Sequence, residues 1–97
     1  TSMSITRLHS GPRMSQGVIH GDTVYLAGQV AQNTRGQSVT AQTEDVLAAI
    51  DSLLSEAGTD KSKLLSATIW LTDMRTFAEM NAVWDAWIDP QNPPARA

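Results

Sequence analysis

Hydrophobic and polar positions change period along the chain. Residues 4–9 alternate, which is typical of a strand with one buried face. The β-rich runs 17–20 and 23–28 flank the pair Gly21-Asp22, and because glycine tolerates the backbone angles of a tight turn, they predict a hairpin. Three short strands are therefore expected in the N-terminal part of the chain.

The next pattern is helical. From about Ser38, apolar residues recur on one helical face, namely Val46, Leu47, Ile50, Leu53, Leu54 and Ala57. Ser38 and Thr40 are both candidate N-caps, and Gly58 stands where a C-terminal cap glycine belongs. After a polar connection at 61–63, residues 65–72 alternate again, which predicts a strand with Trp70 on its second face.

A second helix is expected from the candidate N-cap Asp73 to about Ile88, with an apolar stripe of Phe77, Met80, Trp84, Trp87 and Ile88. Asn81 interrupts this stripe. A buried amide without a hydrogen bond costs about 1–3 kcal/mol, so Asn81 needs a partner. Two interpretations stay open: it ties down a neighbouring loop, or it contacts a ligand.

A stiff loop follows Asp89-Pro90 and ends in Pro93-Pro94-Ala95-Arg96. Consecutive prolines fix φ and favour extended backbone, so Arg96 is delivered from a rigid support to the expected start of a strand. A guanidinium can pair with a carboxylate through two parallel hydrogen bonds. On the local sequence alone an ordinary surface arginine is the better interpretation, so a binding role depends on the rest of the chain.

This order of elements predicts an α+β fold in which two helices cover one face of a sheet. Tyr25, Thr68 and Trp70 indicate that the other sheet face is partly apolar, and faces of this kind are buried by oligomerisation. The 97 residues are expected to form one domain, 1–97.

Composition narrows the function classes. Seven Lys and Arg against ten Asp and Glu give a net charge of -3, and because the basic residues are scattered we expect no nucleic-acid partner. The absence of cysteine excludes disulfides and thiolate metal sites. No apolar run approaches the roughly 18 residues of a membrane span, so we expect no membrane partner and a cytoplasmic location.

The common catalytic motifs are missing, including HExxH, GxSxG and a phosphate-binding glycine loop. His20 is expected in a turn and His9 has no evident partner in the sequence. The carboxylates expected on solvated helix faces are Glu44, Asp45, Asp51, Glu56, Glu79 and Asp85. Candidate chemistry is thus confined to Arg96, Asn81 and the strand end Gly28-Gln29, whose backbone can be approached closely.

An ordered set of short segments resembles the RidA family, also called the YjgF or reactive-intermediate deaminase family, and most of all its YoaB-like branch. The most specific segment is Pro94-Ala95-Arg96, and the others are Ser15-Gln16, Ala27-Gly28-Gln29, Gln42-Thr43, Glu56-Ala57-Gly58, Ala67-Thr68-Ile69, 77–81 and 84–87. The resemblance implies a fold like that of bacterial chorismate mutase: a mixed sheet with both helices on one face, assembled as a homotrimer with a central barrel and clefts between subunits.

The family's activity is implied in the same way. Members with this arginine hydrolyse enamines and imines such as 2-aminoacrylate to 2-oxo acids and ammonia, without a cofactor or metal. By position, Arg96 would clamp the carboxylate of a small 2-imino or 2-oxo acid, and Gly28 would offer its backbone beside the reacting nitrogen. Met14 replaces the tyrosine of many members. The other substrate-binding residues implied are Asn81, Arg13, Met14 and Ala27.

Relatives continue for roughly two strands of ordinary length past the position of Ala97. We therefore expect further strands that close the open sheet edge and carry the acidic residue handling the proton or water. Two alternatives to the deaminase stay open. Met14 and the acid missing from 1–97 favour a non-catalytic trimer that binds small carboxylates, whereas the acidic charge balance disfavours an endoribonuclease or translation inhibitor.

Overall fold

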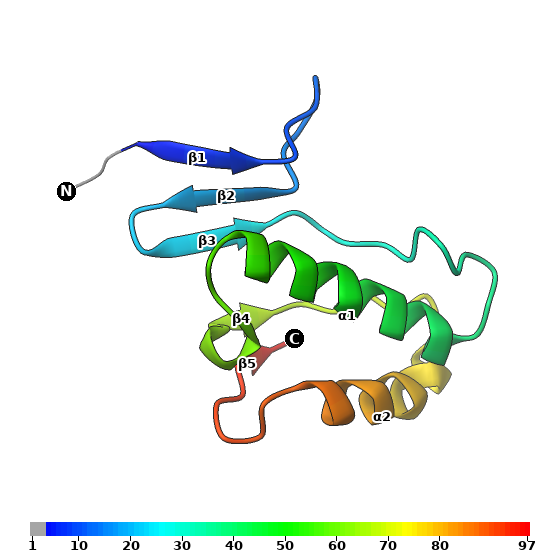
Figure 1. Cartoon of the computed structure of the whole chain (residues 1–97). Coiled ribbons are helices and arrows are strands. Elements are labelled where there is room, and N and C mark those ends of the chain that lie inside the picture. Colours follow the sequence, from blue (N-terminus) through cyan, green and yellow to red (C-terminus); the bar gives the residue numbers. More distant parts are fainter. Residues whose placement is uncertain (1–3) are drawn as a thin grey trace.

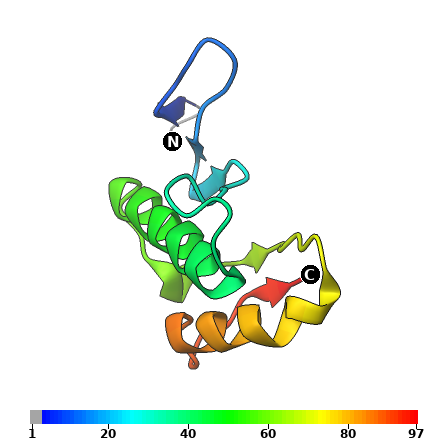
Figure 2. The same cartoon turned by 90° about the vertical axis from the view of Figure 1, so that its right-hand side faces the viewer.

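The computed structural model describes residues 4–97. Figure 1 shows helix α1 between a three-stranded sheet at one end and helix α2 at the other, and the turned view in Figure 2 gives the same order. The molecule is broad and thin, with principal extents of 46 × 35 × 19 Å. Two helices combined with a sheet confirm the predicted α+β class.

The predicted strand and hairpin form an antiparallel sheet in the order β1-β2-β3, from β1 (Ile5–Leu8), β2 (Gly17–His20) and β3 (Thr23–Leu26). His20 pairs with Thr23, so Gly21 and Asp22 make a two-residue turn, and Gly21 adopts a φ of +61°. A side chain at Gly17 would meet methyl groups of Leu8 and Leu26 at 3.2 and 3.3 Å, which explains why glycine stands at this buried position.

Helix α1 (Val39–Glu56) begins and ends where the sequence pattern predicts. The Ser38 side chain accepts a hydrogen bond from the Ala41 backbone N–H at 3.2 Å, so Ser38, not Thr40, is the N-cap. After the helix, Gly58 takes a φ of +81°, as expected of a glycine that ends a helix. A short 3₁₀ helix, η1 (Lys61–Lys63), leads to the next strand.

The strand predicted over 65–72 is much shorter in the structure, and the single mixed sheet is not formed within residues 4–97. β4 (Ser66–Ala67) pairs in parallel with β5 (Ala95–Arg96), apart from the antiparallel sheet. The final hydrogen bond of this ladder runs from the Ile69 N–H to the Ala97 carbonyl at 2.8 Å. A strand requires a hydrogen-bonded neighbour, and the paired neighbour of β4 extends only this far.

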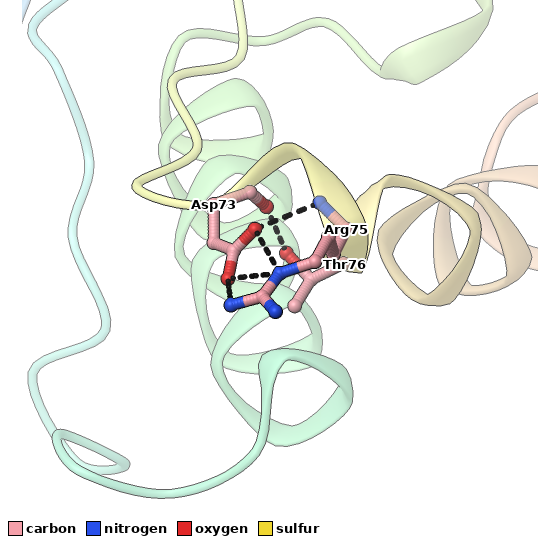
Figure 3. A network of polar contacts seen from close by, with 3 residues as sticks. All are labelled: Asp73, Arg75 and Thr76. Atoms are coloured by element: carbon pink, nitrogen blue, oxygen red, sulfur yellow. Dashed lines mark hydrogen bonds and ion pairs between the residues drawn. The ribbon is translucent and has the colours of Figure 1, made fainter.

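Asp73 caps a 3₁₀ turn, η2 (Met74–Thr76), that continues directly into α2 (Phe77–Trp87). Its carboxylate accepts hydrogen bonds from the Arg75 backbone N–H at 2.9 Å and from the Arg75 guanidinium at 2.8 Å, while its carbonyl accepts one from the Thr76 hydroxyl (Figure 3). These bonds, led by that from the Arg75 side chain, hold the pKa of Asp73 below its ordinary value.

The core lies between the two helices and β4. Leu47 of α1 packs on Met80 and Trp84 of α2, and the alternating side chains Ala67, Ile69 and Leu71 pack against this cluster. This confirms the side of β4 predicted to be buried. Trp70 points the other way and is 88% exposed. Among the described residues, no helix is both long and apolar enough to cross a membrane.

Candidate functional site

Arg96 is held by a side chain of α2. Its Nη1 donates a hydrogen bond to Asn81 Oδ1 at 2.7 Å, although the residues lie 15 positions apart in the sequence. This bond joins β5 to the middle of α2. Of the two interpretations of Asn81, the structure supports the first: within the chain, its side-chain amide anchors the C-terminal loop through the hydrogen bond from Arg96.

Two aromatic rings flank the same guanidinium. Arg96 Cζ lies 5.3 Å from the centroid of the Trp84 ring and 5.8 Å from that of Phe77. Phe77, Asn81 and Trp84 are spaced four and three positions apart, so all three face one side of α2. A cation near an aromatic face is stabilised electrostatically, and more strongly where water is partly excluded. Trp84 is only 7% exposed, so the guanidinium rests on a buried ring.

The loop before Arg96 is organised by Asp89. Its carboxylate accepts hydrogen bonds from the Gln91 backbone N–H at 2.9 Å and from Asn92 Nδ2 at 3.1 Å. The bond from Asn92, followed by that from Gln91, lowers the pKa of Asp89. Pro93 and Pro94 then lead into β5, so a fixed turn and two stiff residues set the direction of Arg96.

The guanidinium still has free donors. Arg96 is exposed as a residue, and within residues 4–97 its Nε and Nη2 donate to no protein acceptor. Its hydrogen-bond partner is a neutral amide, so the positive charge is not neutralised by an ion pair in the described part of the chain. A charged, oriented guanidinium with unused N–H groups can bind a carboxylate.

The other predicted site residues form a separate group near the antiparallel sheet. The Ala27 N–H donates to the Gln16 carbonyl at 2.9 Å, and Gln29 Nε2 donates to Gln16 Oε1 at 3.0 Å. This fixes the strand end that carries Gly28, which is exposed and has open space where a side chain would stand. Arg13 and Met14 are exposed in the loop between β1 and β2, and Met14 is 48% exposed.

These two groups do not meet within one chain. The hydrogen bond and ring contacts of Arg96 go to α2, and in residues 4–97 none of its hydrogen bonds or ring contacts involves the segments around Met14 or Gly28. The structure therefore brings together Arg96 and Asn81, and leaves Arg13, Met14, Ala27 and Gly28 at a different place.

Several charged residues have partners that the sequence does not reveal. His9, with a φ of +51°, contacts Glu56 through Nε2 at 2.7 Å, which joins the end of β1 to the end of α1. Three carboxylates expected to be merely solvated also bind neighbouring elements: Asp45 accepts from the Asn33 N–H, Glu79 from Thr40 and Asp51 from Trp87. In residues 4–97, no three histidine or carboxylate groups gather where a metal could bind.

Phe77 and Trp84 are the site residues that sequence reasoning missed. Both were assigned to the apolar stripe, which is correct for Trp84 but incomplete for Phe77, whose side chain is 39% exposed. The available signal was Asn81 between two aromatic residues at helical spacing. A polar break in an aromatic face indicates that a polar group from elsewhere packs there.

Fold and site together define a small α+β protein whose exposed arginine is held on an aromatic helix face. A model of the family described as "Endoribonuclease L-PSP" matches residues 4–97. A "RutC family protein" of Haemophilus influenzae is 43% identical over 95 residues, which cover 98% of this chain and 82% of the relative. The "RutC family protein YoaB" of Escherichia coli K12 is 42% identical over 94 residues, covering 97% and 81%.

Among solved structures, a member of the YjgF protein family from Neisseria meningitidis aligns with a TM-score of 0.93 and 45% identity, over 98% of this chain and 78% of that one. The chain belongs to the RidA/YjgF family and has YoaB-like relatives. The family resemblance predicted from the sequence is thereby confirmed.

Proposed function

We propose that the protein hydrolyses small enamine or imine derivatives of amino acids, such as 2-aminoacrylate, to 2-oxo acids and ammonia. Arg96 binds the substrate carboxylate, and the Gly28 backbone lies beside the reacting nitrogen. An enamine first takes up a proton at its terminal carbon and becomes the imine. Water then adds to the imine carbon, the carbon–nitrogen bond breaks, and the nitrogen leaves as ammonia while the carbonyl forms. Imine hydrolysis is facile, so orientation of the substrate and one proton relay supply the needed acceleration.

The observation that carries the proposal is the state of Arg96. The guanidinium is exposed, is fixed by Asn81 at 2.7 Å and keeps two nitrogens without a protein partner in the described residues. Arg35 also bonds to a single amide oxygen, but the Arg96 guanidinium additionally lies against the Phe77 and Trp84 rings. Free donors on a cation immobilised in this way favour a ligand with a carboxylate.

We further propose that the site forms between copies of the chain in a homotrimer. Arg96 and Asn81 lie apart from Met14 and Gly28 within one chain, and a second copy can supply the missing side. Large apolar side chains away from the core support assembly, namely Ile5, Tyr25, Leu65 and Trp70, which are 47%, 61%, 76% and 88% exposed.

Activity is tested by following 2-oxo acid release from a system that generates 2-aminoacrylate. We expect the wild-type protein to exceed the spontaneous rate, and Arg96→Ala to lower the rate to the spontaneous one because the substrate carboxylate loses its partner. Arg35→Ala is the matched control, since Arg35 is an exposed arginine bonded only to Gln32, and it should retain full activity. A wild-type rate equal to the spontaneous rate would refute the deaminase.

The alternative is a protein that binds 2-oxo acids without turnover. It is favoured by Met14, whose thioether offers no hydroxyl to the site, and by the lack of a carboxylate in contact with Arg96 in residues 4–97. Calorimetry that detects pyruvate binding in a protein with no deaminase activity would select it.

An endoribonuclease is the second alternative, because the matching family model carries that description. The net charge of -3 weighs against binding a polyanion. RNA cleavage by the purified protein that disappears in Arg96→Ala would revive this alternative.

A further inference from the structure

The orientation of the Asn81 amide is fixed by chemistry. A guanidinium has only donors, so the atom facing Arg96 Nη1 at 2.7 Å must be the amide oxygen. The NH₂ group of Asn81 therefore points elsewhere, and within residues 4–97 it has no protein acceptor. The pair consequently presents several unused N–H donors, from Asn81 Nδ2 and from Arg96 Nε and Nη2.

The hydrogen bond from Nη1 leaves one edge of the guanidinium entirely unused. The five N–H bonds lie in one plane, and a carboxylate can pair in parallel either with Nη1 and Nη2 or with Nε and Nη2. Asn81 accepts from Nη1, so within residues 4–97 the edge formed by Nε and Nη2 keeps all of its N–H donors.

Trp84 and Phe77 restrict the guanidinium further. Their ring centroids lie 5.3 and 5.8 Å from Arg96 Cζ, so rotation of the planar group away from Asn81 would give up both ring contacts. A flexible arginine must lose side-chain freedom when it binds a ligand, whereas a fixed one has already lost it.

We infer that Asn81 is a positioning residue: it aligns Arg96 on the Trp84 and Phe77 rings so that the edge of Nε and Nη2 receives the ligand carboxylate. This inference rests on the proposed carboxylate-binding role of Arg96. It assigns Asn81 a role distinct from direct contact with the reacting part of the substrate.

Calorimetry with two probes tests the inference. Pyruvate carries a carboxylate and a 2-oxo group, whereas propionate carries the carboxylate alone. Because a misaligned guanidinium binds any carboxylate poorly, Asn81→Ala should weaken the binding of both probes by about tenfold. Asn33→Ala is the matched control, because Asn33 makes its hydrogen bond through the backbone, and it should change neither affinity.

Arg96→Lys separates positioning from general damage to the fold. A lysine ammonium keeps the charge but has no plane to align. Adding Asn81→Ala to the Arg96→Lys variant should therefore lower the affinity for the probes less than twofold. Structural damage would instead lower the affinity tenfold both in wild-type protein and in the Arg96→Lys variant. If Asn81→Ala does not fold, as judged by thermal unfolding, Asn81→Ser replaces it because serine is too short to reach Arg96.

The inference is overturned if Asn81→Ala weakens the binding of pyruvate but not of propionate, since Asn81 would then contact the 2-oxo group. It is also overturned if Asn81→Ala weakens the binding of neither probe. Failure of the proposed function looks different. If the wild-type protein binds both probes but does not hydrolyse imines, the proposed deaminase activity is refuted and the positioning role of Asn81 still stands. A wild-type protein that binds neither probe refutes both.

Discussion

The Asp73 carboxylate makes two kinds of hydrogen bond: it caps the backbone of η2, and it accepts from the Arg75 side chain. Both bonds favour the ionised form, so the pKa of Asp73 is lower in the folded protein than its ordinary value of 3.8. A carboxylate with a lowered pKa stabilises the fold above its unfolded pKa, and this stabilisation is lost as the pH falls through the folded value.

We therefore expect Asp73→Ala to lower the melting temperature at pH 7, and the difference from wild type to shrink as the pH falls below 3.8. The group is exposed, so the effect should be modest. Thermal unfolding followed by circular dichroism across pH 3 to 7 is the measurement. Arg75→Ala is the control, since it leaves the backbone bond in place and should lose less. A difference that does not depend on pH would contradict the assignment.

Single residues show which interactions can be anticipated. The caps Ser38 and Asp73 follow from a few neighbouring positions, because a capping bond spans two or three residues. The partners of Asn81 and His9 lie 15 and 47 positions away. Such contacts depend on how the chain folds back, so the sequence indicated that Asn81 needs a partner but did not identify Arg96.

At the scale of elements, α1 and α2 are joined mainly through Leu47, Met80 and Trp84. Met80 is only 2% exposed, whereas Met74 in η2 is 69% exposed. We expect Met80→Ala to lower the free energy of unfolding by about 2–4 kcal/mol, because it removes apolar contacts and leaves a cavity between the helices.

Urea unfolding measures this change, and Met74→Ala provides the matched control, with an expected change within about 0.5 kcal/mol. Equal effects of the two substitutions would show that the cluster between the helices does not carry the stability assigned to it.

The helices were predictable and the second sheet was not. Helical periodicity and caps are local, so the bounds of α1 were predicted to within a residue or two. The strand pattern at 65–72 correctly indicated which side chains face the core, but strand length depends on a neighbouring strand. β4 is hydrogen-bonded only where β5 and Ala97 accompany it, and this pairing is not encoded in residues 65–72.

At the scale of the whole molecule, the accessible surface area is larger than expected for a monomer of this mass. Its accessible area is 6844 Å², whereas a monomer of this size is expected to have about 5,400 Å². Its radius of gyration is 14.3 Å, against about 12.5 Å for a typical domain of this length. Part of this surface is formed by large apolar side chains, which partner chains would cover in the proposed assembly.

Trp70 is the residue to test for that assembly, because it lies in the segment after β4 and is 88% exposed. We expect wild-type protein to sediment as a trimer and Trp70→Ser to shift the population towards smaller species, since the indole would no longer be buried between copies. Lys63→Ser, another exposed substitution on the nearby η1, should leave sedimentation unchanged. A monomeric wild type, or a Trp70→Ser variant that assembles normally, would contradict the proposal.

The separation of Arg96 and Asn81 from Met14 and Gly28 has a thermodynamic consequence. In the proposed site, a small acid touches two copies at once and so acts as a bridge between them. By mass action, whatever favours the bridged state also protects it from heat, so the melting temperature should rise with the concentration of the acid and of the protein alike. Dilution alone would then weaken the apparent affinity for the acid.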